Sequence, residues 1–245
     1  MFRSINFAKI QDEEMTVPEH LEEISQRLFF CLRLIVMAIT TSFTNIISII
    51  QIFQNPAVGV KFLQYSPGEY FFASMKISTL CAIFFSIPIA LYESILYLTP
   101  SLTRGELEFM VPLVLGSYTL FTLGGYFGHS VLIPVALKFF VEYGTSIIEP
   151  FWSFNQYFNF VIFLIFAAGL TFQIPIVQIM SGVLRIISGA SMLSYWRSIV
   201  LLLTILAAVI TPSTDPLTQV ALSATLLTLY VFGSGIVMFL QYYYL

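Results

Sequence analysis

Long apolar runs separated by short polar stretches make up most of this sequence. A run of about 20 apolar residues is long enough to cross the hydrocarbon core of a bilayer as a helix. The runs lie at 29–52, 71–98, 109–135, 156–180, 198–211 and 217–240. This pattern predicts an all-α integral membrane protein with six transmembrane helices, forming one helical domain over residues 1–245.

The fifth of these runs is the weakest candidate for a membrane span. It holds about 14 residues, roughly 21 Å of helix, against a hydrocarbon core of about 30 Å. The sequence TPSTDP (211–216) separates it from the sixth run, because proline ends a helix. We therefore expect helices five and six to be short, and to pair as a shallow hairpin if the fifth does not cross fully.

The composition supports a membrane protein. Of the 245 residues, 58% are hydrophobic and 9% are charged, and the mean hydropathy is +0.90. A soluble domain carries about 25% charged residues, so most of this surface must face lipid.

The basic residues predict the orientation. With six spans, both termini and the loops 99–108 and 181–197 lie on one side. That side holds or adjoins Arg3, Lys9, Arg27, Arg33, Arg104, Arg185 and Arg197, and the other holds Lys61, Lys76 and Lys138. Basic residues concentrate on the inner side of membranes, so both termini are predicted inside.

Prolines recur within the apolar runs, at Pro88, Pro112, Pro134 and Pro175. Proline kinks a helix, and neighbouring helices or a cavity must satisfy the freed backbone groups. The expected bundle is therefore kinked and concave.

The polar stretch TVPEHLEEISQRL (16–28) precedes the first span within an inner amphipathic segment, 1–28. Thr16 and Glu19 have the spacing of a capping box, which indicates the start of a helix. Its apolar residues, Leu21, Ile24 and Leu28, share one face. The acidic residues either lie in water on an interfacial helix, or receive a cationic ligand.

Other polar residues can likewise have either a structural or a functional role. Glu106 and Glu108 flank the start of the third span, where carboxylates also favour the helix dipole. Glu93, His129 and Gln173 lie within apolar runs, where polar groups either join helices or line a polar site. A proton-coupled small-solute transporter that uses these three residues as a midplane site is the alternative function.

Several classes of protein find no support in the sequence. There is no phosphate-binding loop, HExxH or GxSxG motif, and the paired groups of an intramembrane enzyme are missing, so we predict no catalysis. A net charge of −3 without a basic patch argues against nucleic acid. Cys31 and Cys81 lie in apolar runs without CxxC spacing, so neither a metal nor another cofactor is predicted. The polar first 28 residues lack the apolar core of a secretory signal and are too acidic for a transit peptide.

Six motifs in order resemble the TatC family, the multispanning core of the twin-arginine protein translocase. PEHLEEISQRL (18–28) resembles its HLxELRxRL signature. The second motif combines NP (55–56) with SPGEYF (66–71), and the third combines YE (92–93) with TPSLTRGE (99–106). The last three are FGHSVLIPVALKFF (127–140), NFVIFLIFAAGLTFQIP (159–175) and ITPSTDPLTQ (210–219).

The resemblance implies a function for the acidic residues. TatC proteins bind signal peptides that carry two consecutive arginines, and by position Glu23 and Glu106 are the carboxylates that receive them. Carboxylates suit this role because the guanidinium of arginine can donate two parallel hydrogen bonds to a carboxylate. The ammonium of lysine cannot reproduce this geometry. Strong selection requires a partly dry groove or help from the apolar segment of the signal. Weaker candidates for the same site are Glu19, Glu22, Arg27 and Tyr97.

The family also implies partners and further sites. We expect single-span TatA/TatB-type subunits, a homo-oligomer within a receptor complex, contact with membrane lipid, and export of folded proteins driven by the proton-motive force. Gln173, Glu93 and Asp215 are candidate partner-docking or intramembrane polar residues, and Pro56 an assembly or structural residue.

The chain departs from the family pattern at Ser25, at ELE (106–108), and at Gln173, where many relatives carry an acid. Its Phe-, Ile- and Tyr-rich composition suits an A+T-rich plastid genome and a thylakoid membrane, with bacterial or mitochondrial inner membranes as alternatives.

Overall fold

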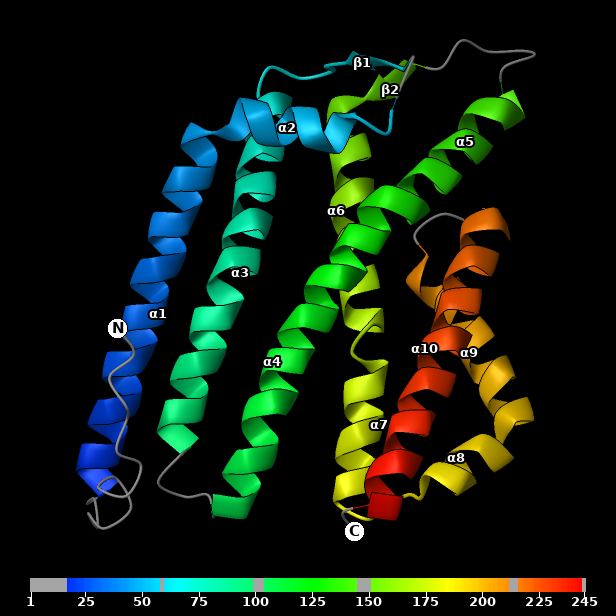
Figure 1. The fold of residues 1–245 in the computed structure, drawn as a ribbon. Coiled ribbons are helices and arrows are strands. Elements are labelled where there is room, and N and C mark those ends of the chain that lie inside the picture. Colours follow the sequence, from blue (N-terminus) through cyan, green and yellow to red (C-terminus); the bar gives the residue numbers. More distant parts are fainter. Residues whose placement is uncertain (1–16, 58–59, 99–103, 145–150, 212–215, 244–245) are drawn as a thin grey trace. The chain divides into compact units, whose positions relative to one another are not determined.

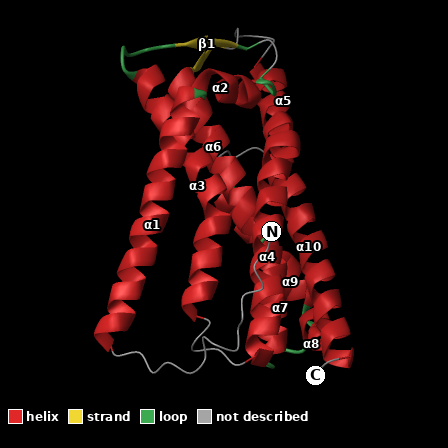
Figure 2. Ribbon diagram, turned by 60° about the vertical axis from the view of Figure 1, so that its left-hand side comes forward, coloured by secondary structure: helices red, strands yellow, loops and turns green. Residues whose placement is uncertain are grey.

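The computed structural model describes residues 17–57, 60–98, 104–144, 151–211 and 216–243. Almost all of this chain is helical (Figure 2). It divides into two compact units, which we describe separately. Unit 1 comprises Met1–Asn45 and Ser78–Tyr118, and unit 2 comprises Ile46–Ile77 and Thr119–Leu245.

Unit 1 contains α1 (Val17–Thr44), the C-terminal part of α3 (Glu69–Leu98) and the first part of α4 (Arg104–Phe127). After Pro18, α1 contains neither proline nor glycine, so the helix runs without a break from the acidic stretch into the apolar one. The segment predicted as a separate interfacial helix is therefore the start of this long helix.

The first span ends earlier than predicted. The boundary at residue 52 was wrong, because α1 ends at Thr44 and α2 (Ile46–Gln54) is a separate helix. Asn45 lies between them, and its side-chain Nδ2 donates to the carbonyl of Thr41 at 2.9 Å. Asparagine side chains compete with the backbone for hydrogen bonds in this way, which accounts for a helix end within an apolar run.

Unit 2 contains α2, the first turns of α3, the end of α4 and the rest of the chain. Its remaining elements are β1 (Lys61–Leu63), the π-helix η3 (Gly128–Leu132), α5 (Ile133–Gly144), β2 (Phe151–Ser153), α6 (Phe154–Thr171), α7 (Ile174–Val183), α8 (Gly189–Ser194), α9 (Trp196–Ile210) and α10 (Pro216–Tyr243). Within this unit, α10 packs against α7, α8 and α9 (Figure 1).

The two strands were not predicted. β1 and β2 pair in parallel, with Lys61 opposite Phe151 and Leu63 opposite Ser153 (Figure 1). Each strand has only three residues, too few for a recognisable alternation of apolar and polar positions. Aromatic packing supports the pair, since the rings of Phe62 and Tyr157 lie 4.9 Å apart between centroids.

Two of the predicted prolines coincide with breaks in helices. Pro134 follows the π-helix η3, and Pro175 lies in the first turn of α7, just after the break at Phe172 and Gln173. Proline has no N–H and clashes with the carbonyl four residues earlier, so the preceding turn widens or opens. Pro88 and Pro112 lie inside α3 and α4, which continue past them. The concave shape of the bundle stays a prediction.

Close packing in unit 2 depends on small residues. A Cβ added to Gly124 would lie 2.7 Å from the carbonyl oxygen of Ala168 and 2.9 Å from the Cα of Gly169. Gly128, one turn further on, faces the same helix, α6. Small residues four apart let two membrane helices approach closely, so this glycine pair sets the distance between the end of α4 and α6.

Five stretches of the described helices are long and apolar enough to cross a membrane. They are Leu21–Thr44, Glu69–Ser94, Met110–Tyr143, Phe154–Val183 and Pro216–Tyr242. α9 is apolar but has only 15 residues, about 22 Å of helix. The protein is therefore a helical multi-pass membrane protein, while six crossings and inner termini stay predictions.

Candidate functional site

A cluster of charged side chains joins the two main helices of unit 1. Arg27 on α1 donates through Nε and Nη2 to Oε1 of Glu23, at 2.9 and 2.6 Å. Its Nη1 donates to Oε2 of Glu93 on α3 at 2.7 Å. We call Glu23, Arg27 and Glu93 the charged triad. It brings together three residues that the sequence analysis had assigned to two different sites.

The sequence places these residues through simple helix geometry. Glu23 and Arg27 are four residues apart, so they meet on one face of α1. Glu93 lies 66 residues from Arg27, and the pair forms because α1 and the C-terminal part of α3 run side by side (Figure 1).

The triad is partly shielded from solvent and has excess negative charge. The side chains of Arg27, Glu23 and Glu93 are 26%, 22% and 19% exposed. Two carboxylates and one guanidinium leave a formal charge of −1. Among the described residues, Oε2 of Glu23 is buried and has no hydrogen-bond partner. Such an atom carries a desolvation cost that a further donor would relieve.

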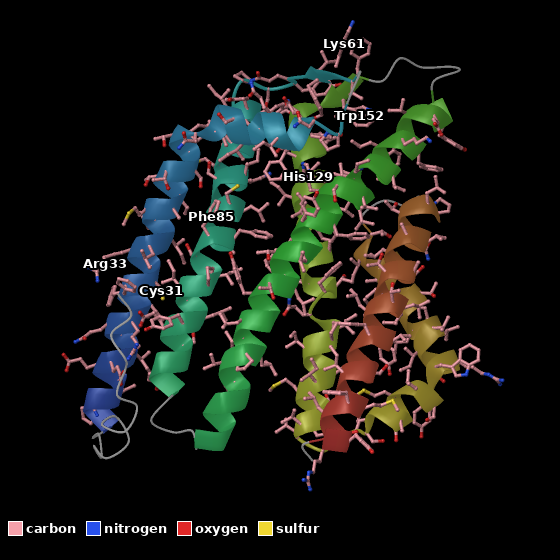
Figure 3. All side chains as sticks on the ribbon, viewed as in Figure 1. Cys31, Arg33, Lys61, Phe85, His129 and Trp152 are labelled. Atoms are coloured by element: carbon pink, nitrogen blue, oxygen red, sulfur yellow. The ribbon has the colours of Figure 1, made fainter. Side chains whose placement is uncertain are left out.

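A groove of about 370 Å³ runs beside the triad, within unit 1. Its lining is mostly apolar and comprises Ile24, Arg27, Leu28, Cys31, Ala90, Glu93, Ser94 and Tyr97. Figure 3 marks Cys31 on α1, while Arg33, further along the same helix, extends outward. The groove therefore places an apolar surface directly next to carboxylates that already bind a guanidinium.

The other acidic candidates lie outside this cluster. Glu22 is exposed and accepts a hydrogen bond from Gln26 at 3.3 Å, so it behaves as a solvated helix residue. Glu19 and Glu106 lie in the first turns of α1 and α4, and their side chains lie outside the described part of the structure. Thr16 of the expected capping box and Asp215 also lie outside the described residues.

The remaining candidates belong to unit 2. Gln173 is half-buried in the break between α6 and α7, rather than within a continuous helix, and its carbonyl accepts from the N–H of Val177. Pro56 is half-buried in a turn after α2, which the N–H of Ala57 closes by donating to Gln54 at 2.8 Å. Partner docking at Gln173 and an assembly role for Pro56 stay predictions.

His129 has a packing partner in the structure. Its Nε2 lies 3.1 Å from the carbonyl oxygen of Ile52, and its ring meets that of Phe53 edge-on. The contact ties the π-helix η3 to α2, which favours the helix-joining interpretation of this histidine.

The sequence analysis missed a second carboxylate site, in unit 2. Glu69, 7% exposed, accepts from the hydroxyl of Ser153 at 2.5 Å, from the N–H of Asn155 at 2.9 Å and from the N–H of Tyr65 at 2.7 Å. Ser153 is the N-cap of α6, so the carboxylate holds the start of that helix against the loop before α3. The motif SPGEYF drew attention to this stretch, but nothing in the sequence indicated partners more than 80 residues away.

Comparison with known proteins identifies the family. A family model, described as Sec-independent protein translocase protein (TatC), matches residues 19–224. The chain belongs to the TatC family. A protein of this family is a translocase component and not an enzyme.

Relatives come from algae and plants. The chain is 48% identical over 229 residues to a tatC-like protein, ycf43, of Porphyra purpurea, covering 94% of this chain and 90% of that one. It is 45% identical over 228 residues to the chloroplastic Sec-independent protein translocase protein TATC of Oryza sativa subsp. japonica, covering 92% of this chain and 64% of that one. These TatC relatives indicate a multi-pass membrane protein of plastids.

Solved TatC structures share the fold. A crystal structure of the twin arginine translocase receptor TatC aligns with a TM-score of 0.70 at 28% identity, covering 89% of this chain and 99% of that one. A second structure, in the detergent DDM, aligns with a TM-score of 0.72.

Proposed function

We propose that this chain is the receptor subunit of a twin-arginine translocase, which binds signal peptides carrying two consecutive arginines. The observation that supports this most directly is the charged triad, because its carboxylates already bind one guanidinium through three short hydrogen bonds. The solved structures with this fold are described as twin arginine translocase receptors.

The groove beside the triad supplies a condition that such selectivity requires. An exposed ion pair contributes only about 0–1 kcal/mol, whereas a shielded charge-assisted hydrogen bond contributes roughly 1.5–3 kcal/mol. The triad side chains are less than 30% exposed, and the adjoining surface is mostly apolar. We propose that the arginines bind at Glu23 while the apolar segment of the signal peptide lies along this surface.

The wider arrangement is part of the same proposal. Six membrane crossings with both termini inside would put Glu23 and Glu106 on the side where signal peptides are made. We assign the chain to the thylakoid membrane, in a homo-oligomeric receptor complex with TatA/TatB-type subunits. The complex exports folded proteins, and the proton-motive force drives this export. Gln173, Asp215 and Pro56 remain candidates for docking or assembly.

No described contact favours the alternative of a proton-coupled transporter. Glu93 is paired with Arg27, and His129 contacts a backbone carbonyl, so each has a partner suited to structure or to guanidinium binding.

The receptor proposal can be tested with the purified protein in lipid nanodiscs. Two fluorescent peptides would be compared, identical except that one carries two arginines and the other two lysines before an apolar segment. We expect the arginine peptide to bind at least about tenfold more tightly, since lysine cannot reproduce the forked hydrogen bonds. Equal affinities for the two peptides would contradict the proposal.

A further inference from the structure

Arg27 makes the contacts to Glu23 and Glu93 that an arginine from outside would make. Three of its N–H-bearing nitrogens, Nε, Nη1 and Nη2, bind the two carboxylates. We propose that Arg27 occupies the site in place of the ligand, and that a signal peptide binds when its arginines displace Arg27 from Glu23 and Glu93. This proposal rests on the proposed function.

Shielding of Glu23 is the first argument for exchange. One carboxylate oxygen of Glu23 is taken by Arg27, and the other, Oε2, is buried without a described partner. A guanidinium from a ligand can therefore bind both oxygens of Glu23 only if the triad rearranges. Some side chain must move, and Arg27 is the one that covers the acceptor.

The structure leaves space for the side chain of Arg27 to leave the triad. Its side chain is 26% exposed, so its guanidinium can turn into water without crossing the protein interior. The groove beside it, about 370 Å³, adjoins both Arg27 and Glu93 and provides room for an incoming side chain. The guanidinium, on a flexible stem, gains hydration in this movement, which offsets part of the loss of its ion pairs.

Charge balance gives the second argument. With Arg27 in place the triad has a formal charge of −1, which matches a single arginine. With Arg27 turned into water, Glu23 and Glu93 together present two negative charges, which match two consecutive arginines. The exchange therefore makes Glu93 the second receiving carboxylate, a role that the sequence analysis had not assigned to it.

The test compares the affinity of the twin-arginine peptide for four variants in nanodiscs. We expect Arg27→Gln to bind the peptide about tenfold more tightly, because the internal competitor is lost. Glu23→Gln and Glu93→Gln should each bind it about tenfold more weakly. The matched control is Arg33→Gln, the same change on the same helix at an exposed arginine outside the triad, which should bind as the wild type does.

Each outcome distinguishes the exchange from the receptor function. If the wild-type protein does not prefer arginine over lysine, the proposed function itself fails. If that preference is present but Arg27→Gln binds equally or more weakly, Arg27 positions Glu23 rather than competing for it, and the exchange is overturned.

A second measurement does not depend on the folding of Arg27→Gln. Arg27→Lys keeps the positive charge and introduces an amine whose acylation can be followed by mass spectrometry. With an amine-free twin-arginine peptide, we expect acylation at residue 27 to become several-fold faster, because exchange moves the amine into water. Slower acylation on binding would show that residue 27 stays under the ligand and would overturn the exchange.

Discussion

Two carboxylate clusters in this protein are built in opposite ways. Glu69 in unit 2 is satisfied by neutral donors, namely one hydroxyl and two backbone N–H groups, and both of its oxygens are used. Glu23 in unit 1 is satisfied by a charged side chain, Arg27, and keeps one oxygen without a described partner. The first arrangement joins segments of backbone, whereas the second is the one that we propose exchanges one cation for another. The contrast predicts that Glu69 contributes mainly to stability and Glu23 mainly to ligand binding.

The largest effect should follow from Glu69→Gln. The amide replaces one acceptor with a donor, so at least one of the donors from Tyr65, Ser153 and Asn155 loses its partner within a buried site. We expect the free energy of unfolding to fall by about 3 kcal/mol. Thermal denaturation in detergent measures this. Glu142→Gln, which alters an exposed pair with Lys138, is the control and should cost less than about 0.5 kcal/mol.

The comparison would break if Glu69→Gln were as stable as Glu142→Gln. That result would mean that the neutral cluster does not hold the start of α6.

Glu23→Gln should show the reverse pattern. The change weakens the bonds to Arg27 but also removes the charge whose Oε2 is buried without a described partner, so stability should fall by less than about 1 kcal/mol. Affinity for a twin-arginine peptide should fall about tenfold, because the amide cannot accept the same charge-assisted bonds. Fluorescence anisotropy and a melting curve on the same sample measure both. A large loss of stability with unchanged affinity would place Glu23 in the structural class with Glu69.

Ser153→Ala sharpens the structural side of the comparison. The hydroxyl of Ser153 donates to Glu69 and accepts from the N–H of Gln156 as the N-cap of α6. We expect a loss of about 1–2 kcal/mol, since N-cap removal costs about 1 kcal/mol and a charged acceptor also loses a donor. Ser130→Ala, at an exposed serine whose described hydrogen bond runs one turn back to the carbonyl of Tyr126, is the matched control for the melting experiment. Equal melting of the two variants would contradict the role of Ser153.

The smallest expected effect is the different response of the two clusters to ionic strength. Raising the salt concentration shortens the screening length, so peptide binding at the partly exposed triad should weaken a few-fold between about 0.05 and 0.5 M salt. The stability difference between the wild type and Glu69→Gln should stay constant, because neutral donors hold that carboxylate. Titrations and melting curves at both concentrations test this, and binding that is indifferent to salt would argue against an ionic site.

Much of the helical architecture could be predicted because membrane spans depend on local composition. The apolar runs at 71–98 and 217–240 correspond to α3 and α10 within a few residues. The break at Asn45 could not be predicted in this way, since a single side-chain hydrogen bond to Thr41 marks the end of α1 within an apolar run.

The candidate sites also differ in whether they depend on local sequence or on contacts between distant segments. Glu23 was identified through the resemblance, which rests on a motif of neighbouring residues in the sequence. The pairing of Arg27 with Glu93, and of Glu69 with Ser153, depends on which faces of distant helices meet. No periodicity in a single sequence determines that rotation, so Glu93 was grouped with Gln173 and Asp215 rather than with Arg27, and Glu69 was not assigned at all.

The most direct test of the receptor proposal is photo-crosslinking of this protein, in membranes, to signal peptides that carry either two arginines or two lysines. It would be repeated with Glu23→Ala and Glu106→Ala. The account predicts crosslinks that require the arginines and fade when Glu23 is replaced, and it extends the same expectation to Glu106. Crosslinks that are indifferent to the arginines and to both glutamates would contradict it and leave these acids as groups that only cap helices.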